Sequence, residues 1–436
     1  MRPPLRSRGF TLVELLIGGA VGAVVLLGIS LTFISQARQY QAHASRRAIQ
    51  ANARQALAFM GRAVRTAGYG VNPDRAVLAY DSYDVESDSA VPGYPDAVVI
   101  HWRDTLFRRN VASANSNQII VQQLPVDPAD PGAERGLREP LRRGQILLVL
   151  CPLARQHAFV TVRDFVPVGE TTIPLDQTMP ASAVNTPIGA PGRLFHEQAS
   201  LDSEACFSAP GTQVVKVRRA AFYVAMFDAD GLGSTPERTP YLMMHQGLDM
   251  PTDTQPQGDN VIDVNDSVPV AEGIEQLQVA YILNSNNDTA PLVRGVTDDP
   301  MLSPNYYGEQ WERIDPSLLT NWFFDPSVRF TDARRMADHP ANIRQVRLTV
   351  VSRSTVADPD IRGDNLLTAT EGAPLANGTI PWRQLENLGT PAIEDFNPSG
   401  RRFYRVLLRE SITPKNMMMN SQFPPVSFTA NTLGGG

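Results

Sequence analysis

The sequence predicts an α+β protein, in which one long N-terminal helix is joined to a large, mainly antiparallel β body. Three observations predict this fold class. A run of 20 uncharged residues lies near the N terminus, and helical periodicity continues beyond it to residue 64. The rest of the chain changes to short alternating runs between loops rich in Pro, Asp and Gly. Spacing typical of β-α-β units is missing, which favours antiparallel sheets.

The first expected element is the apolar run at 15–34, LLIGGAVGAVVLLGISLTFI. A helix of this length rises about 30 Å, which is the thickness of a bilayer core. A secretory signal peptide would have a shorter apolar stretch and a small-x-small cleavage site. The run therefore predicts a membrane-spanning segment. Glu14 lies directly ahead of it, and a carboxylate in apolar sequence is costly unless it has a partner.

The helix is expected to continue past the membrane. Its apolar positions recur at steps of three or four residues, as on one face of an amphipathic helix: Ile49, Ala53, Ala56, Met60 and Val64. Helix-ending residues follow at Gly68, Gly70 and Pro73. Gly18 and Gly22 form a G-x-x-x-G pattern that can let helices approach closely in a membrane, although such glycines are also ordinary in membrane helices.

The body is expected to begin at residue 74 and to consist of strands separated by long loops. The strands are predicted at 97–102, 118–123, 145–150, 158–163, 213–227, 274–283, 343–351 and 402–408. The segments at 165–212 and 284–342 are expected to be surface loops. A short glycine-rich tail at 432–436 is expected to be disordered.

The distribution of charged residues also changes at the boundary near residue 74. The whole chain has 39 basic and 45 acidic residues and a net charge of −6. Nine of the basic residues but only one acidic residue lie in 1–73, so the body at 74–436 has a net charge of −14. Such a body is not expected to bind nucleic acid, which needs a basic surface.

The segment RGFTLVELLIGGAV at 8–21 resembles the class III signal of type IV prepilins. The resemblance implies that Gly9 ends a leader of residues 1–9. Phe10 is then the first mature residue, N-methylated after cleavage by prepilin peptidase. Glu14 falls at the fifth mature position, where the family implies pairing with the N-terminal amine of a neighbouring subunit. The leader would stay in the cytoplasm, and the body would lie in the periplasm before it reaches the cell surface.

Four further segments resemble the PilW family of minor pilins: 54–70, 270–284, 343–354 and 401–410. This resemblance implies a structural role in priming type IV pilus assembly and a place in a tip complex. Its expected partners are the other minor pilins, the major pilin, a large PilY-type tip adhesin and, before assembly, the inner membrane. The expected domains are the leader at 1–9, the helix at 10–68, the body at 74–431 and the tail.

Two other interpretations stay open. The chain could be a pseudopilin of type II secretion, most like the J-type, because the leader does not discriminate between the two systems. Alternatively, the body could be an adhesive or ligand-binding module, with its long loops as the binding region. An enzyme, a cofactor and a metal site are not expected. The sequence lacks HExxH, CxxC, a phosphate-binding loop with lysine and a nucleophile elbow.

The chain has two cysteines, Cys151 and Cys206. In a body outside the cytoplasm they would be in an oxidising compartment, where a pair tends to form a disulfide. The alternative is two separate buried thiols.

Overall fold

The structure is a computed structural model of the 436-residue chain. It describes residues 11–71, 76–80, 83–84, 89–90, 94–123, 136–151, 156–176, 205–227, 239–250, 258, 266–283, 292–295, 343–355 and 403–418. Gly9, Phe10, the leader and the C-terminal tail lie outside these residues.

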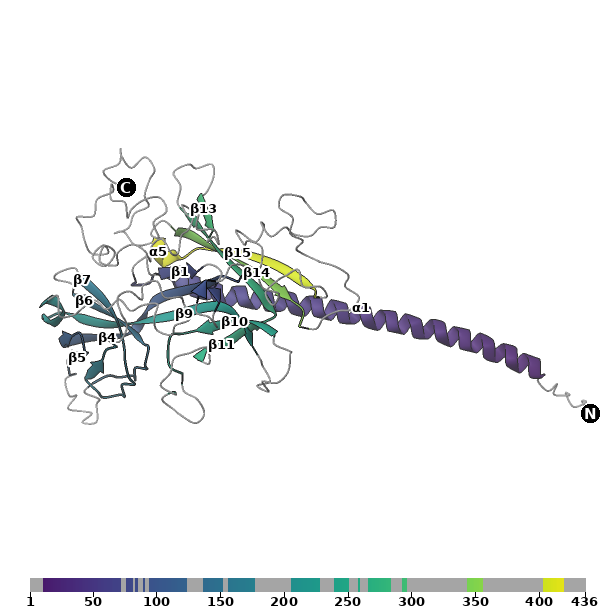
Figure 1. The fold of residues 1–436 in the computed structure, drawn as a ribbon, viewed down its shortest axis with the longest axis horizontal. Helices are drawn as coiled ribbons and strands as arrows, with labels where there is room; N and C mark the ends of the chain where they lie inside the picture. Colours follow the sequence, from purple (N-terminus) through teal and green to yellow (C-terminus); the bar gives the residue numbers. More distant parts are fainter. Residues whose placement is uncertain are drawn as a thin grey trace, which may run out of the picture.

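One long helix, α1 (Leu12–Thr66), projects from one end of the body (Figure 1). It has 55 residues and begins two residues after the expected start of the mature chain. Gly68 and Gly70 follow its C-terminal end with φ angles of +76° and +63°. This left-handed backbone suits glycine and stops the helix, as the sequence predicted.

The described residues form three sheets. The largest, called the larger sheet below, has nine strands, all paired antiparallel. Its main path runs β11-β10-β9-β4-β5-β8, with β1 beside β4 and with β6 between β9 and β7. The strand bounds are β1 Val77–Tyr80, β4 Ala97–Asn115, β5 Gln118–Val121, β6 Ile146–Cys151, β7 Gln156–Thr161, β8 Thr172–Pro174, β9 Gln213–Phe227, β10 Thr239–His245 and β11 Val268–Glu272.

The second sheet has four antiparallel strands in the order β13-β12-β14-β15. Their bounds are β12 Ile274–Leu283, β13 Leu292–Gly295, β14 Ile343–Arg353 and β15 Arg405–Ile412. The third sheet is a two-stranded pair of β2 Tyr83–Asp84 and β3 Ser89–Ala90. Two short helices complete the described elements, η3 Ala205–Ser208 and α5 Lys415–Met418. The expected α+β class, with a mainly antiparallel body, is confirmed.

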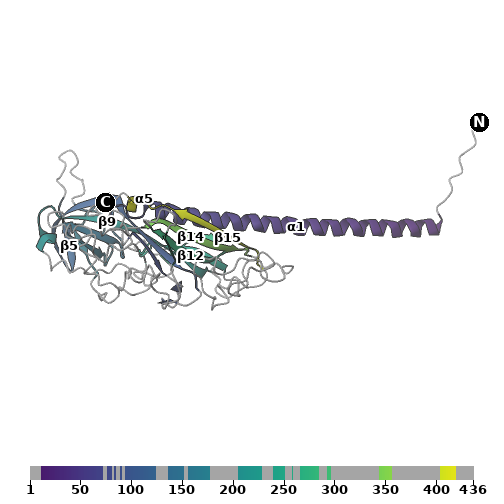
Figure 2. The same cartoon turned by 90° about the horizontal axis from the view of Figure 1, so that it is seen from above.

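The second half of α1 packs against the body, beside β14 and β15 (Figure 2). All five apolar positions predicted for its inner face are buried. Four of them lie in the main hydrophobic core with side chains of both sheets, such as Phe222, Leu277 and Val350. The periodicity seen in the sequence therefore reports a helix face that forms part of the body's core.

Two amides of α1 also close an edge of the larger sheet. Asn52 Nδ2 donates to Glu272 O at 3.0 Å, and Gln55 Nε2 donates to Val270 O at 2.8 Å. These carbonyls belong to β11, the strand at the end of the main path. Edge-strand carbonyls otherwise invite pairing with another chain, so α1 satisfies them within the molecule.

Candidate assembly surface on the N-terminal helix

The first half of α1 is an unpacked apolar rod. Most of its large side chains from Leu12 to Ile34 are exposed, including Leu16, Val24 and Phe33. In the part of the chain that the structure describes, α1 is the one helix long and apolar enough to cross a membrane. A surface this apolar is stable only in lipid or against other apolar helices. A Cβ added at Gly18 or Gly22 would contact nothing within 4 Å, so the G-x-x-x-G face is open.

Glu14 lies at the beginning of this rod and closes a capping box. Its carboxylate accepts from Thr11 N at 2.9 Å and from the Thr11 hydroxyl at 3.0 Å, while Glu14 N donates to Thr11 Oγ1 at 3.2 Å. Two backbone donors that a helix start leaves unpaired are thereby satisfied. Glu14 thus has a local role within the chain, besides the pairing between subunits that the resemblance implies.

Sequence reasoning missed the part that Thr11 plays. The signal was present, because T-x-x-E ahead of an apolar run is the sequence pattern of a capping box. The structure places Thr11 at the N-cap and Glu14 at the third helical position.

A basic stripe follows the apolar rod on the exposed side of α1. Arg47, Arg54 and Arg62 are spaced seven and eight residues apart, and all three are exposed. Residues 37–73 contain no acidic side chain, so no negative charge within this segment balances the basic stripe. Arg65, near the helix end, forms a 3.2 Å ion pair with Glu410 of β15. The outer face of α1 therefore suits an acidic neighbour.

The two cysteines lie in one hydrophobic cluster of the body. Cys151 ends β6 and is buried, and Cys206 lies in η3 against the same cluster. No disulfide joins them in the structure, so the disulfide stays a prediction.

We expect the purified, non-reduced protein to contain this disulfide, which would close a loop of about 55 residues and stabilise the body by about 4 kcal/mol. Alkylation before and after reduction, followed by mass spectrometry, measures it. Cys206→Ser should then lower the free energy of unfolding only in the absence of reductant. Full alkylation of both cysteines without reduction would contradict the pairing.

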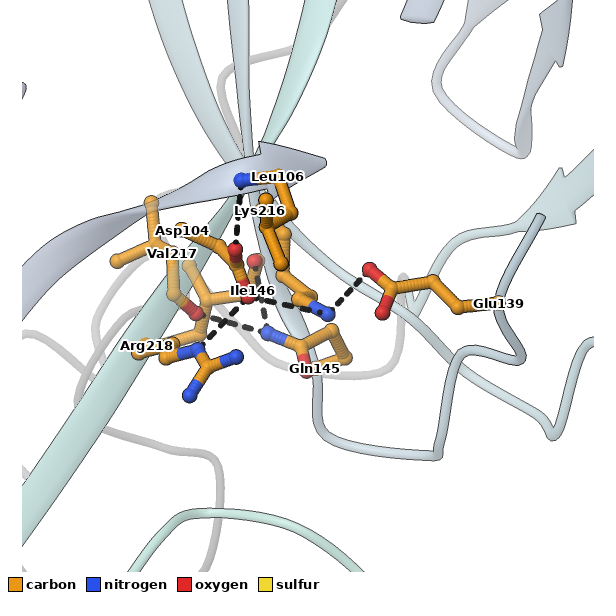
Figure 3. A network of polar contacts seen from close by, with 8 residues as sticks. All are labelled: Asp104, Leu106, Glu139, Gln145, Ile146, Lys216, Val217 and Arg218. Atoms are coloured by element: carbon orange, nitrogen blue, oxygen red, sulfur yellow. Dashed lines mark hydrogen bonds and ion pairs between the residues drawn. The ribbon is translucent and has the colours of Figure 1, made fainter. Parts of the chain in front are cut away.

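A buried polar network crosses the larger sheet at Asp104 (Figure 3). The Asp104 carboxylate accepts from Leu106 N at 2.9 Å and from Arg218 Nε at 2.7 Å, and Lys216 Nζ lies 3.3 Å away. Lys216 also pairs with Glu139. Burial raises the pKa of the Asp104 carboxyl, but the Leu106 amide, Arg218 and Lys216 outweigh burial and hold the pKa below its ordinary value. Asp104 is therefore an anion at neutral pH.

Replacing Asp104 with Asn should lower the free energy of unfolding by about 1–3 kcal/mol at neutral pH, because two cations lose a buried partner. The lowered folded-state pKa means that this stabilisation is full above the unfolded-state pKa of about 3.9 and is lost as the pH falls through the folded-state value. Urea unfolding of both proteins, from about pH 7 down to about pH 3, should show the two curves converging in acid. A difference that is independent of pH would contradict the assignment.

The structure describes no group of three or more His, Cys, Asp or Glu side chains that could hold a metal ion. The loops proposed for ligand binding, 165–212 and 284–342, fall largely outside the described residues. The most distinctive surface in the described residues is thus the N-terminal helix.

The N terminus matches the family model described as the prokaryotic N-terminal methylation motif, over residues 4–30. This match supports a type IV pilin-like protein. The prepilin-type motif implies processing by prepilin peptidase and assembly with other pilins, and it fits a pilin or a pseudopilin component. The motif and the apolar rod are consistent with anchoring in a membrane before assembly. No curated protein and no solved structure matches the chain.

Proposed function

We propose that the chain is a PilW-like minor pilin that helps to prime type IV pilus assembly and sits in a complex at the pilus tip. The observation that carries this proposal is the methylation motif at residues 4–30, which covers most of the exposed apolar rod of α1. A helix with one half exposed and apolar and the other half built into a folded body suits a subunit that assembles through its stem.

The four segments that resemble the PilW family support the finer assignment, because their described parts pack together. They contribute the end of α1, strands β11 and β12, strand β14 and strand β15. Met60, Leu277 and Val350 of the first three segments lie in one hydrophobic core, and Leu408 of the fourth packs against it. The segments that carry the resemblance therefore form a single structural unit.

Steric bulk favours the tip over the shaft. The body after residue 73 has 363 residues, and a crowded shaft accommodates so large a subunit less easily than an end does. The expected partners are the other minor pilins, the major pilin and a large PilY-type tip adhesin. The proposed role is structural and involves no catalysis, cofactor or nucleic acid. The body would be periplasmic before assembly and would then reach the cell surface.

Mass spectrometry of sheared filaments and of membranes tests the proposal. Residues 10–37 contain no Lys or Arg, so trypsin should release the processed N terminus as one peptide ending at Arg38. We expect this peptide with N-methylated Phe10, at low abundance, in purified filaments. A methylated form confined to membranes would favour a pseudopilin. An uncut N terminus in cells with active prepilin peptidase would contradict the proposal.

A further inference from the structure

Strand β4 carries a large bulge where it passes β9. Arg103 lies opposite Val217 and Arg108 lies opposite Val215, so residues 104–107 together face the single residue Lys216. A regular antiparallel ladder would need three residues fewer on β4. Bulges of this kind re-aim side chains and are found beside functional sites.

The buried pair of Asp104 and Lys216, together with the exposed Arg218, holds this bulge in place (Figure 3). The side chain of Asp104, which is 3% exposed, binds the backbone N–H of Leu106 and the side chains of Lys216 and Arg218. Phe107 is buried, and the Lys216 ammonium lies 5.6 Å from the centre of its ring. Taking the charges of Asp104 and Lys216 out of water is costly, so this ion pair is poorly explained by stability alone.

The network fixes Leu106 in an exposed position. Leu106 is 86% exposed, more than any other large hydrophobic side chain in the described residues, the apolar rod of α1 included. A single exposed leucine is ordinary on a protein surface. Here, however, Asp104 Oδ1 accepts from Leu106 N itself. The buried carboxylate therefore fixes the backbone that carries the exposed side chain. The backbone at Leu106 is thereby ordered before a partner binds, which lowers the entropic cost of binding.

Charge and position indicate the kind of partner. Arg108 and Arg218 beside the bulge are exposed. Of the two carboxylates of the network, Asp104 is buried and paired, and Glu139 is paired with Lys216. The bulge also lies past the end of α1, because the adjoining Arg103 donates from its backbone N to Tyr69 O at 2.7 Å. In a membrane-anchored subunit this is the side that faces away from the membrane.

We propose that Leu106 inserts into an apolar pocket, rimmed by carboxylates, on a neighbouring subunit of the same assembly. The subunit's membership of a pilus rests on the proposed function, but the docking contact itself does not. Arg108 and Arg218 pair with the carboxylate rim, and the buried network keeps the leucine projecting between them. Rim charges act mainly on the rate and specificity of association, while the buried leucine contributes affinity.

Photo-cross-linking of the full chain in cells tests the contact. A photoreactive residue at the exposed position of Thr105, with Leu106 intact, should give one major product with another membrane or filament subunit. We expect Leu106→Ser to reduce its yield about tenfold, because burying a leucine side chain contributes at least that factor to binding. Leu106→Met should restore the product, and Arg108→Glu should weaken it, most strongly at low salt.

The matched control is Val168→Ser, which removes another exposed aliphatic side chain of the body and should leave the yield unchanged. Absence of a specific product, or a yield that Leu106→Ser does not change, would overturn the docking proposal. An equal loss in Val168→Ser would do so too. If the Leu106-dependent product forms although methylated protein is missing from filaments, the pilus assignment fails and the docking contact stands.

Discussion

Replacing Glu14 with Gln is expected to reduce the amount of the chain in filaments about tenfold or more, while cleavage after Gly9 proceeds as in the wild type. Glutamine also suits the third position of a capping box, so the bonds to Thr11 can persist. The negative charge is lost, however. If Glu14 pairs with the Phe10 amine of a neighbour, that ammonium group is then left unpaired in apolar surroundings, where a loss of about 1.4 kcal/mol already changes the equilibrium tenfold.

Thr11→Val is the matched control, because it removes the hydroxyl that caps α1 and keeps the charge of Glu14. Loss of an N-cap costs about 1 kcal/mol of helix stability. We expect little effect on incorporation, since Thr11→Val keeps the charge of Glu14 and leaves the second half of α1 packed against the body. The measurement is the ratio of the processed N-terminal peptide in filament and membrane fractions. Normal incorporation of Glu14→Gln combined with a loss in Thr11→Val would show that the cap matters and the charge does not.

The elements predicted most closely are those whose pattern is local. Strands β9 and β12 have the predicted bounds, 213–227 and 274–283, because both are long runs of alternating apolar residues. Five residues of the buried face of α1 were predicted correctly for the same reason. In these segments the residues that determine the element are the residues of the element itself.

Strands β10 and β11 were missed because their sequences contradict strand propensity. The β10 segment TPYLMMH has an early proline and two methionines, and the β11 segment VPVAE is short and also contains proline. Strand β13 was missed inside a segment predicted as a loop, and so was β8. These short strands form by pairing with neighbours that are distant in the sequence.

The bulge of β4, at a candidate site, also depends on contacts between distant residues that the sequence pattern did not predict. The strand was predicted only at 97–102, since the charged residues that follow do not alternate. The structure continues it to Asn115, because the residues after the bulge pair with β9 and β5. Asp104, within the bulge, finds its cationic partners on β9, more than a hundred residues away. Nothing near Asp104 in the sequence indicates that partnership. A contact between distant charges is a tertiary feature, and single-sequence patterns do not carry it.

The four-stranded sheet contains a second buried charge cluster, centred on Glu275 of β12. Arg405 of β15 donates to Glu275 through Nε at 2.6 Å and through Nη2 at 3.0 Å, and Arg353 of β14 donates at 3.4 Å. The side chains of Glu275 and Arg405 are 0% and 1% exposed. Both guanidinium groups also lie over the ring of Phe403, at 4.4 Å for Arg353 and 5.7 Å for Arg405. The cluster therefore ties three strands together.

Glu275→Ala is expected to destabilise the body by about 3–5 kcal/mol, because it leaves two buried guanidinium groups without their carboxylate. Urea unfolding of the full chain in detergent measures this free energy. Hydrogen exchange should speed up first in β15, which pairs only with β14 among the described strands. The matched control is Asp164→Ala, which removes the 2.7 Å pair with Arg163, whose side chains are 53% and 56% exposed. Exposed pairs contribute about 0–1 kcal/mol, so this change should be close to neutral.

A second variant separates charge loss from cavity formation. Replacing both Glu275 and Arg405 with Leu removes the most deeply buried ion pair and keeps apolar volume in the sheet. Arg353, whose side chain is 13% exposed, is then the one charge of the cluster that remains. Buried ion pairs replaced in this way are often neutral for stability. We therefore expect the double variant to recover most of the stability lost in Glu275→Ala. If it is as unstable as Glu275→Ala, the large effect arises from packing around Phe403 and not from the unpaired charges.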